Sequence, residues 1–317
     1  MTPVGRLAPS PTGAQHLGNA WTYCLAYAAA LSAGGRIHLR IEDIDTPRTK
    51  PGADQQAIED LRWLGLRWSG QVVYQTQRRE RYNAVLQHLI DQNLVYPCIC
   101  SRKDVEASGS APHFDHEPSI YGGTCRQWQS GDAVPELPHC WRFRFSESTA
   151  EFDDLVLGPQ SCEPNNHLGD FPVTQKTGDP SYQLAVVVDD HDTGINQVVR
   201  GNDLLVSTFR QLAIYKAMRW QPPVHAHVPL IVGEDGRRLA KRHGDTRLSQ
   251  YRRGGMDASK ILHWINETIG FDVFGSGDSD DLAIDQGFNW SRIASLPRRI
   301  QMPNFGCENR SFEGPKP

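Results

Sequence analysis

The sequence predicts an α/β protein, in which a parallel sheet with crossover helices is interrupted by an insertion. Over the first hundred residues, short apolar strand patterns alternate with helical patterns. A segment rich in Gly, Pro and Ser follows, and strand and helix patterns then resume. Strands separated by helices are joined by crossovers, which makes neighbouring strands parallel.

The first half of the sheet is predicted within residues 1–97. Residues 4–7 and 36–43 predict strands, the second because Ile37, Leu39 and Ile41 alternate with polar residues. Three helices are expected, at residues 20–32, after Pro51 with an apolar stripe of Ile58, Leu61, Trp63 and Leu64, and at residues 78–92.

Residues 98–180 predict the inserted domain, with a strand at residues 140–146 whose Trp141, Phe143 and Phe145 point to one side. The chain has seven cysteines, an odd number that does not suggest a disulfide framework. The close pair Cys98 and Cys100 fits reduced thiols or a metal site.

The second half of the sheet is expected at residues 181–235. "LAVVVDD", residues 184–190, predicts a strand buried on both faces, because it is almost continuously apolar. A helix at residues 204–218 and a strand within 227–233 follow. The remaining predicted parts are a basic loop with helices at 236–270 and a linker-like tail at 271–317, with a mobile linker at 274–281.

The composition is that of a soluble globular protein, at 38% hydrophobic and 22% charged residues. The sequence has no apolar run of about 20 residues and no signal peptide pattern, so we expect no membrane association and a cytoplasmic location. The net charge is −4, but residues 236–253 hold seven Lys or Arg and one acid. A solvated basic face is the alternative to a ligand-binding loop.

The turn "PSPTGAQHLGN", residues 9–19, lies between the first strand and the first helix. Ligands of open α/β sheets bind at the carboxyl ends of strands, and a helix N-terminus attracts anions. His16 adds a donor, and Gly13 and Gly18 permit close approach. The turn therefore predicts a phosphate site, although an ordinary turn with a structural histidine is the alternative.

Together this turn and the basic loop resemble the two signatures of class I aminoacyl-tRNA synthetases. Residues 16–19, "HLGN", stand where that family has HIGH, and residues 238–242, "RLAKR", stand where it has KMSKS. "RLAPSPTGAQHLGNA", "LRIEDIDTPR" and "VVRGNDLL" narrow the resemblance to glutamyl-tRNA synthetases, over residues 3–255. It implies a Rossmann-type class I sheet, an inserted zinc-containing acceptor-like domain and a short helical stem-contact region.

The chemistry that the resemblance implies is carboxylate activation, in which a carboxylate attacks the α-phosphate of ATP, with Mg²⁺ on the phosphates. His16 and Lys241 would be the catalytic donors, although Lys241 is alternatively an exposed loop lysine. The sequence departs from the motifs at Asn19, Arg238 and Ala240, the last of which removes one hydroxyl contact. The implied ATP-binding residues are Thr12, His16, Gly18, Asn19, Arg238, Leu239 and Lys241.

The substrate acid implied by the resemblance is L-glutamate. Arg6 and Arg200 would hold its carboxylates, because a guanidinium binds a carboxylate through two hydrogen bonds. Glu42 would face the ammonium and Tyr182 would close the pocket, although a surface ion pair and a core aromatic are the alternatives. The implied glutamate-binding residues are Arg6, Ala8, Ser10, Glu42, Tyr182 and Arg200.

A structural Zn²⁺ site is expected at Cys98, Cys100, Tyr121 and Cys125, with Tyr121 named by the resemblance. His113 and His116 lie in the same loop as competing ligands. The other cysteines are expected to be ordinary thiols: Cys24, Cys140, Cys162 and Cys307.

Few residues follow position 253, so we expect no anticodon-binding domain. The short members of the family are glutamyl-queuosine tRNA(Asp) synthetases, and the resemblance to them implies transfer of glutamate to queuosine in the anticodon of tRNA(Asp). Glutamate activation without tRNA and a monomeric state are expected. The alternatives are an adenylate-forming paralogue with another acceptor, a truncated conventional glutamyl-tRNA synthetase, and a catalytically silent RNA-binding homologue.

Overall fold

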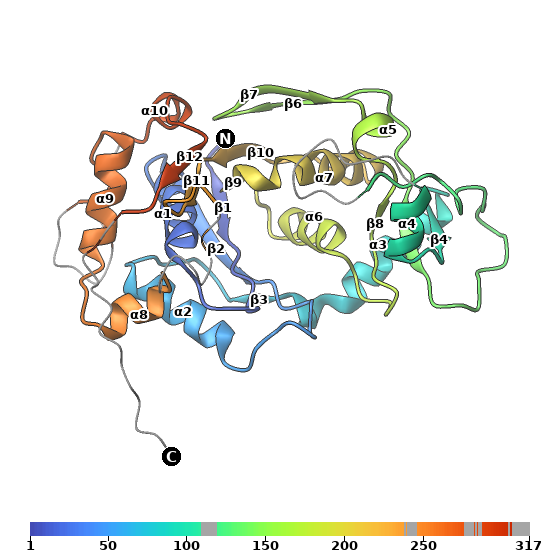
Figure 1. Ribbon diagram of the computed structural model, residues 1–317, viewed down its shortest axis with the longest axis horizontal. Coiled ribbons are helices and arrows are strands. Elements are labelled where there is room, and N and C mark those ends of the chain that lie inside the picture. The colour runs from blue at the N-terminus through green and yellow to red at the C-terminus, as the bar shows by residue number, and fades with distance from the viewer. Residues whose placement is uncertain are drawn as a thin grey trace, which may run out of the picture.

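Two short sheets, built mainly of parallel strands, stand side by side at the centre of the protein (Figure 1). The computed structural model describes residues 1–108, 119–237, 239, 246–275, 282, 284, 287–303 and 305. In the first sheet, β1 (Val4–Leu7) pairs with β2 (Arg36–Ile41), which pairs with β3 (Val73–Tyr74). β1 and β2 confirm the strands predicted at residues 4–7 and 36–43, whereas β3 was not predicted.

The second sheet has the strand order β7-β6-β10-β9. Its strands are β6 (Ala150–Asp154), β7 (Gly158–Cys162), β9 (Gln197–Gly201) and β10 (Val224–Val228). Val4 and Asn196 join the sheets, because the Asn196 N–H donates to the Val4 carbonyl at 3.0 Å and the Asn196 Oδ1 accepts from the Val4 N–H at 2.7 Å. β1 therefore lies beside β9.

Helices cover this central layer. The predicted helices at residues 20–32, after Pro51 and at 78–92 are confirmed. The helices of the sheet domain are α1 (Leu17–Leu31), α2 (Ala53–Trp63), η1 (Gln75–Arg78), α3 (Arg79–Asp91), α6 (Tyr182–Asp192), η2 (Asn202–Leu204) and α7 (Leu205–Ala217).

The strand predicted at residues 184–190 is wrong, because this segment forms the helix α6. Every residue from Leu184 to Asp190 is buried, so the apolar run reflects a helix that is enclosed on all sides. A short apolar run does not distinguish a buried strand from a buried helix. The first strand of this half is β9, which begins at Gln197 and was not predicted.

The strand predicted within residues 227–233 is interrupted at Pro229, which separates β10 from β11 (Leu230–Val232). β11 pairs with β12 (Arg299–Gln301) from the predicted linker-like tail. That tail also holds α10 (Trp290–Ala294), whose Ile293 is fully buried. The tail is therefore packed against the domain where the structure describes it, and residues 276–281 of the predicted linker lie outside the described part.

The inserted segment forms an antiparallel sheet of β4 (Val95–Cys98), β5 (Cys140–Phe143) and β8 (Phe171–Pro172). The helices α4 (Arg102–Ser108) and α5 (Pro164–His167) accompany it. β6 and β7 come from the same segment but extend the second central sheet, β6 parallel to β10 and β7 antiparallel to β6.

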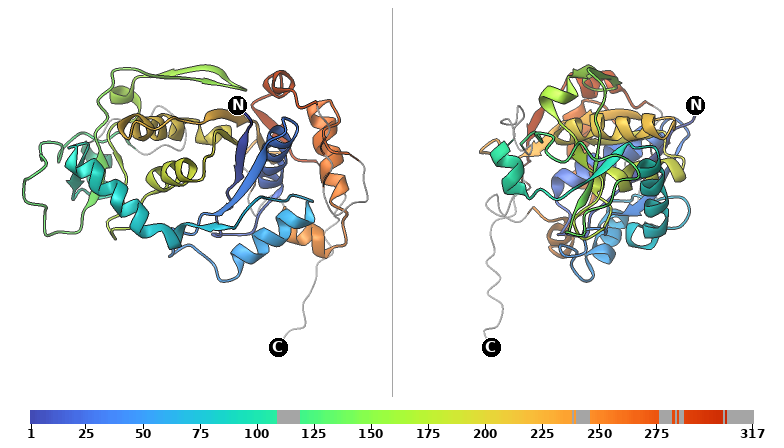
Figure 2. Two further views of the ribbon diagram at one scale, coloured as in Figure 1. Left: turned by 180° about the vertical axis from the view of Figure 1, so that it is seen from behind. Right: turned by 90° about the vertical axis from the view of Figure 1, so that its right-hand side faces the viewer.

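The inserted sheet lies at one end of the molecule, and α8 (Leu248–Arg253), α9 (Ser259–Ile269) and α10 lie at the other (Figure 2). Among the described residues, none of the helices combines the length and the apolar character that crossing a bilayer requires.

Candidate active site

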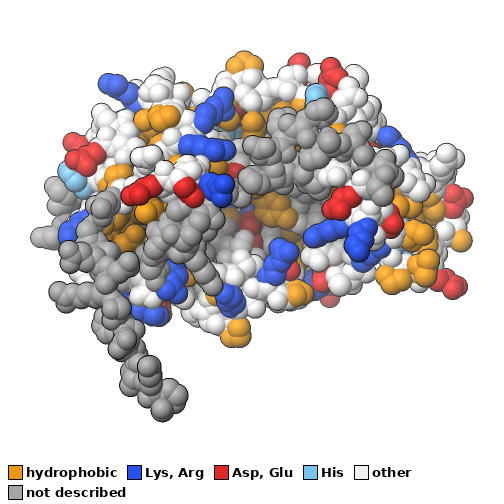
Figure 3. Space-filling view, viewed as in Figure 1, with side chains coloured by type: hydrophobic (Ala, Val, Ile, Leu, Met, Phe, Trp, Pro, Cys, Tyr) orange, Lys and Arg blue, Asp and Glu red, His pale blue; other side chains and the backbone are white. Residues whose placement is uncertain are grey.

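A cavity of about 660 Å³ opens at the carboxyl ends of β1 and β9. The face seen in Figure 1 is hollowed near its centre, and Lys and Arg side chains gather around the hollow (Figure 3). The cavity brings together all the predicted ATP and glutamate residues that the structure describes: Arg6, Ala8, Ser10, Thr12, His16, Gly18, Asn19, Glu42, Tyr182, Arg200 and Leu239.

The start of α1 forms one wall of this cavity. His16 is the N-cap of α1, and its backbone N–H donates to Asn19 Oδ1 at 3.0 Å. Asn19 thus stabilises the helix start. A Cβ on Gly18 would lie 3.1 Å from the His16 ring, so glycine permits this close packing.

The end of the basic loop lies against the same turn. The Leu17 N–H donates to the Thr246 carbonyl at 3.1 Å, and the Leu248 N–H donates to the Gln15 carbonyl at 2.9 Å. The end of the basic segment therefore lies beside the first predicted motif. Of the second motif the structure describes only Leu239, which lines the cavity, and Arg238 and Lys241 lie outside the described residues.

The other end of the cavity holds buried charges. Glu42 Oε1 accepts from Arg40 Nη2 at 3.1 Å, and Arg40 Nη1 donates to Asp190 Oδ1 at 2.5 Å. Arg6 Nε lies 3.8 Å from the same Asp190 oxygen. Glu42 is therefore part of a buried network rather than of a surface ion pair.

Arg200 lines the same cavity and is 3% exposed. Its guanidinium contacts Tyr182 Oη at 3.5 Å, Thr208 Oγ1 at 2.6 Å and His227 Nε2 at 3.1 Å. Burial lowers the pKa of Arg200. No carboxylate of the described residues forms a salt bridge with Arg200, which leaves its charge available to an anionic ligand.

Sequence reasoning missed several residues of the site. Gln15 and Tyr23 line the cavity, and the Tyr23 hydroxyl donates to Gln15 Oε1 at 3.0 Å. The missed buried polar residues beneath it are Arg40, Asp154, Asp189, Asp190, Thr208 and His227. Asp189 and Asp190 could have been found from the segment "VVVDD", because two acids at the end of an apolar run indicate buried carboxylates that need partners.

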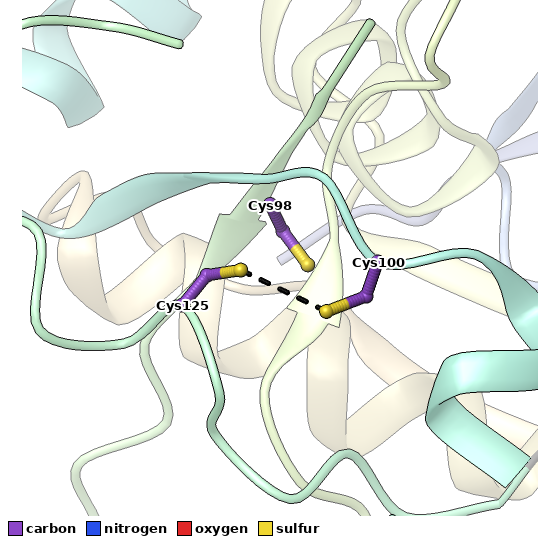
Figure 4. Close-up of side chains that lie close together, drawn as sticks. All are labelled: Cys98, Cys100 and Cys125. Atoms are coloured by element: carbon purple, nitrogen blue, oxygen red, sulfur yellow. Dashed lines mark hydrogen bonds between the residues drawn. The ribbon is translucent and has the colours of Figure 1, made fainter. Parts of the chain in front are cut away.

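The predicted metal ligands converge in the inserted sheet. The sulfur atoms of Cys98, Cys100 and Cys125 lie within 4.8 Å of one another (Figure 4). The Tyr121 hydroxyl lies 3.5 Å from Cys98 Sγ and 3.7 Å from Cys100 Sγ, and it accepts from the Cys125 N–H at 2.7 Å. A hydrogen bond with Cys140, aided by one with Tyr121, lowers the pKa of Cys98 to about 4 despite its burial. The cluster can therefore hold a metal ion.

The competing ligands His113 and His116 lie outside the described residues, as does Cys307. Cys24 and Cys162 are free buried thiols, as expected. Cys140 is also buried, and its thiol donates to the Cys98 carbonyl at 3.6 Å.

The parallel strands, the start of α1 and the end of the basic segment beside it are consistent with the catalytic domain of a class I synthetase. The chain belongs to the family described as tRNA synthetases class I (E and Q), catalytic domain, which matches residues 4–275.

Several relatives of this chain carry more specific names. It is 48% identical to a Glutamyl-Q tRNA(Asp) synthetase of Rhodopirellula baltica, over 96% of this chain and 97% of the relative. It is 42% identical to a protein of the same name from Nitratidesulfovibrio vulgaris, over 82% of this chain and 84% of the relative.

A solved structure shares the fold. The glutamate tRNA ligase of Elizabethkingia meningosepticum, in complex with its amino acid, matches with a TM-score of 0.74 and 25% identity. The match covers 94% of this chain and 67% of that ligase.

The network predicts an unusual effect of Glu42→Gln. Burial raises the pKa of Glu42, against the opposing charges of Arg40 and Arg6. When a carboxyl has a higher pKa in the folded than in the unfolded protein, the free energy of unfolding decreases as the pH rises from the unfolded-state pKa through the folded-state pKa. Above both values the folded protein bears the cost of a buried charge. At pH 7.5 we therefore expect Glu42→Gln to raise Tm by about 2 °C, and the gain to shrink at pH 5.

Thermal unfolding at both pH values measures this effect. The control is Glu136→Gln, at an exposed position, which should leave Tm unchanged. A clear fall in Tm of Glu42→Gln at pH 7.5 would show that the ionised carboxylate stabilises the fold through Arg40.

Proposed function

We propose that this protein activates L-glutamate with ATP and transfers the glutamyl group to queuosine in the anticodon of tRNA(Asp). The observation that carries the proposal is one cavity that joins a helix N-terminus to two buried arginines and a glutamate. The relatives named Glutamyl-Q tRNA(Asp) synthetase support the acceptor, because the chain covers 97% and 84% of the first two.

Glutamate presents two carboxylates and one ammonium to the site. Arg6 and Arg200 bind the carboxylates, and Glu42 receives the ammonium. Ser10 donates to Glu42 Oε2 at 3.4 Å, which orients that carboxylate toward the cavity. Tyr182, at the start of α6, covers the amino acid.

ATP lies along the start of α1, where backbone N–H groups and the helix dipole attract its phosphates. The glutamate α-carboxylate attacks the α-phosphate, and the bond to the leaving pyrophosphate breaks. His16 and Lys241 donate to the phosphoryl oxygens as charge builds there. The other ATP-binding residues of the proposal are Thr12, Gly18, Asn19, Arg238 and Leu239, and Mg²⁺ bound with ATP supplies charge neutralisation.

A hydroxyl of the queuosine ring then attacks the adenylate carbonyl. AMP leaves with the electron pair of the broken bond, and the hydroxyl proton is released. The Lys and Arg side chains around the hollow, together with the basic segment 236–253, provide cations for the phosphates of the anticodon arm. The enzyme acts on cytoplasmic tRNA as a monomer.

The cysteine cluster would hold Zn²⁺. Three thiolates and one phenolic oxygen fit a closed tetrahedral structural site, because soft thiolate ligands suit zinc. When bound, the ion would tie the loop of Tyr121 and Cys125 to the strand that ends at Cys98.

The function is tested with labelled glutamate and purified tRNAs. Pyrophosphate exchange into ATP should occur with glutamate alone, because the amino acid site lies within this chain. tRNA(Asp) that carries queuosine but lacks its 3′-terminal adenosine should accept glutamate, whereas intact tRNA(Asp) with unmodified guanosine should not.

Each alternative gives its own pattern in these assays. The opposite acceptor preference would identify a conventional glutamyl-tRNA synthetase. Exchange without transfer to either tRNA would indicate another acceptor, and absence of exchange would indicate a silent homologue.

His16→Ala should lower kcat for exchange by about a hundredfold and change KM for glutamate little, because the donor acts on the transition state. The control is His191→Ala, whose ring stacks on Trp220 at 3.9 Å and is not among the residues that line the cavity. A change confined to KM for glutamate in His16→Ala would argue against this role.

Protein purified without chelator should contain one Zn²⁺ per chain, and Cys100→Ser should lose it. The matched control Cys162→Ser, on β7, should retain the ion. Elemental analysis measures both, and active wild-type protein without zinc would contradict the proposal.

A further inference from the structure

A chain of buried polar groups runs beneath Arg200. Asp154, at the end of β6, lies 2.6 Å from His227 Nδ1 on β10, and His227 Nε2 lies 3.1 Å from Arg200 Nε. Thr208 Oγ1, on α7, is 2.9 Å from the same His227 nitrogen and accepts from Arg200 Nη2 at 2.6 Å. The side chains of Asp154 and His227 are fully buried.

The hydrogen bonds select one tautomer of His227. Arg200 Nε–H is a donor only, so His227 Nε2 must accept. The ring proton therefore lies on Nδ1, where Asp154 Oδ2 accepts it. Burial lowers the pKa of His227, and the charge of Arg200 lowers it further, whereas Asp154 raises it. The lowering effects dominate, so the imidazole is neutral.

Asp154 is itself fixed by the backbone. Its Oδ1 accepts from the N–H groups of Val156 and Leu157, both at 2.9 Å, and from the His227 N–H at 3.1 Å. Although burial opposes it, the hydrogen bond from His227 and those from the backbone lower the pKa of Asp154. The carboxylate is thus charged, oriented and unable to reach Arg200 directly.

This arrangement differs from the one around Arg40, which donates directly to a carboxylate of Asp190 at 2.5 Å. A carboxylate bound directly to Arg200 would compete with a substrate carboxylate for the guanidinium. The neutral imidazole of His227 accepts a hydrogen bond from Arg200 Nε and does not neutralise the charge of the guanidinium. The outer N–H groups of Arg200 can therefore bind the substrate.

We propose that Asp154 and His227 are positioning residues that orient Arg200 for the glutamate carboxylate. Asp154 sets the tautomer of His227, and His227 sets the rotation of the guanidinium through an accepting nitrogen. The same logic, a carboxylate that orients an imidazole, recurs in metal sites and catalytic triads. This inference rests on the proposed function, because it assigns Arg200 a glutamate carboxylate.

The test is Asp154→Asn, which preserves size. The amide oxygen of the new side chain can keep the backbone donors, while its NH₂ group faces His227 Nδ1. The ring must then carry its proton on Nε2, which turns a donor toward Arg200 Nε–H. We expect KM for glutamate in ATP–pyrophosphate exchange to rise about tenfold or more, with KM for ATP within about twofold of wild type.

A second substitution distinguishes positioning from folding. In the double variant Asp154→Asn with His227→Gln, the amide oxygen of the glutamine side chain at position 227 can accept from Arg200 Nε. This hydrogen bond does not depend on the residue at position 154. KM for glutamate should therefore fall back toward the wild-type value. The matched control is His225→Gln, on the same strand, whose ring is parallel to that of His227 at 6.0 Å and which should leave KM for glutamate unchanged.

The tautomer is measured directly by ¹⁵N NMR of histidine-labelled protein, with His227→Gln assigning the signal. Wild type should show Nδ1–H and Asp154→Asn should show Nε2–H. An Nε2–H signal in wild type overturns the inference, and so does an unchanged glutamate KM in Asp154→Asn.

A parallel rise of both KM values with a lower Tm, or no recovery in the double variant, also overturns it. Failure of the proposed function is distinct, because wild type itself would then show no glutamate-dependent exchange, and the inference would fall with it.

Discussion

The pairing of buried arginines with the two acids of α6 is the interaction on which the site depends. Arg6 on β1 and Arg40 on β2 carry their charges into the interior, where an unpaired cation would be strongly destabilising. Asp190 lies against both arginines. Asp189 accepts from Gln75 at 2.9 Å and from Arg78 at 2.6 Å, on the 3₁₀ helix before α3. One turn of a helix from the second half therefore holds the strands of the first half in place.

This pairing also explains why α6 is a helix. Two consecutive acids in a strand would point to opposite faces of a sheet. In α6 both carboxylates are directed toward arginines and a tyrosine, since the Tyr82 hydroxyl donates to Asp189 at 2.9 Å. The apolar run before them is part of a hydrophobic core, to which Leu184, Val187 and Val188 belong.

Features whose residues lie close together along the chain could be predicted from the sequence, and features that join distant segments could not. The start of α1 and the cysteine cluster were predicted because their residues are near in sequence, as in Cys98, Cys100 and Cys125. Arg6, Glu42 and Arg200 were found only through a resemblance. The partners of Arg200 come from β6, α7 and β10, and no local pattern connects Asp154 with His227. Sheet topology alone brings them together, because β6 and β10 are neighbours.

The pairing of β11 with β12 makes the cavity dependent on the far end of the described chain. Leu230 and Ile231 line the cavity, and their partners in β12 are Arg299 and Ile300. Without β12, β11 would present unpaired N–H and C=O groups to solvent, an edge that favours association with other chains. Shortening the protein before residue 299 would thus expose a self-associating edge beside the cavity. Fusion partners and truncations are better designed to leave this strand intact.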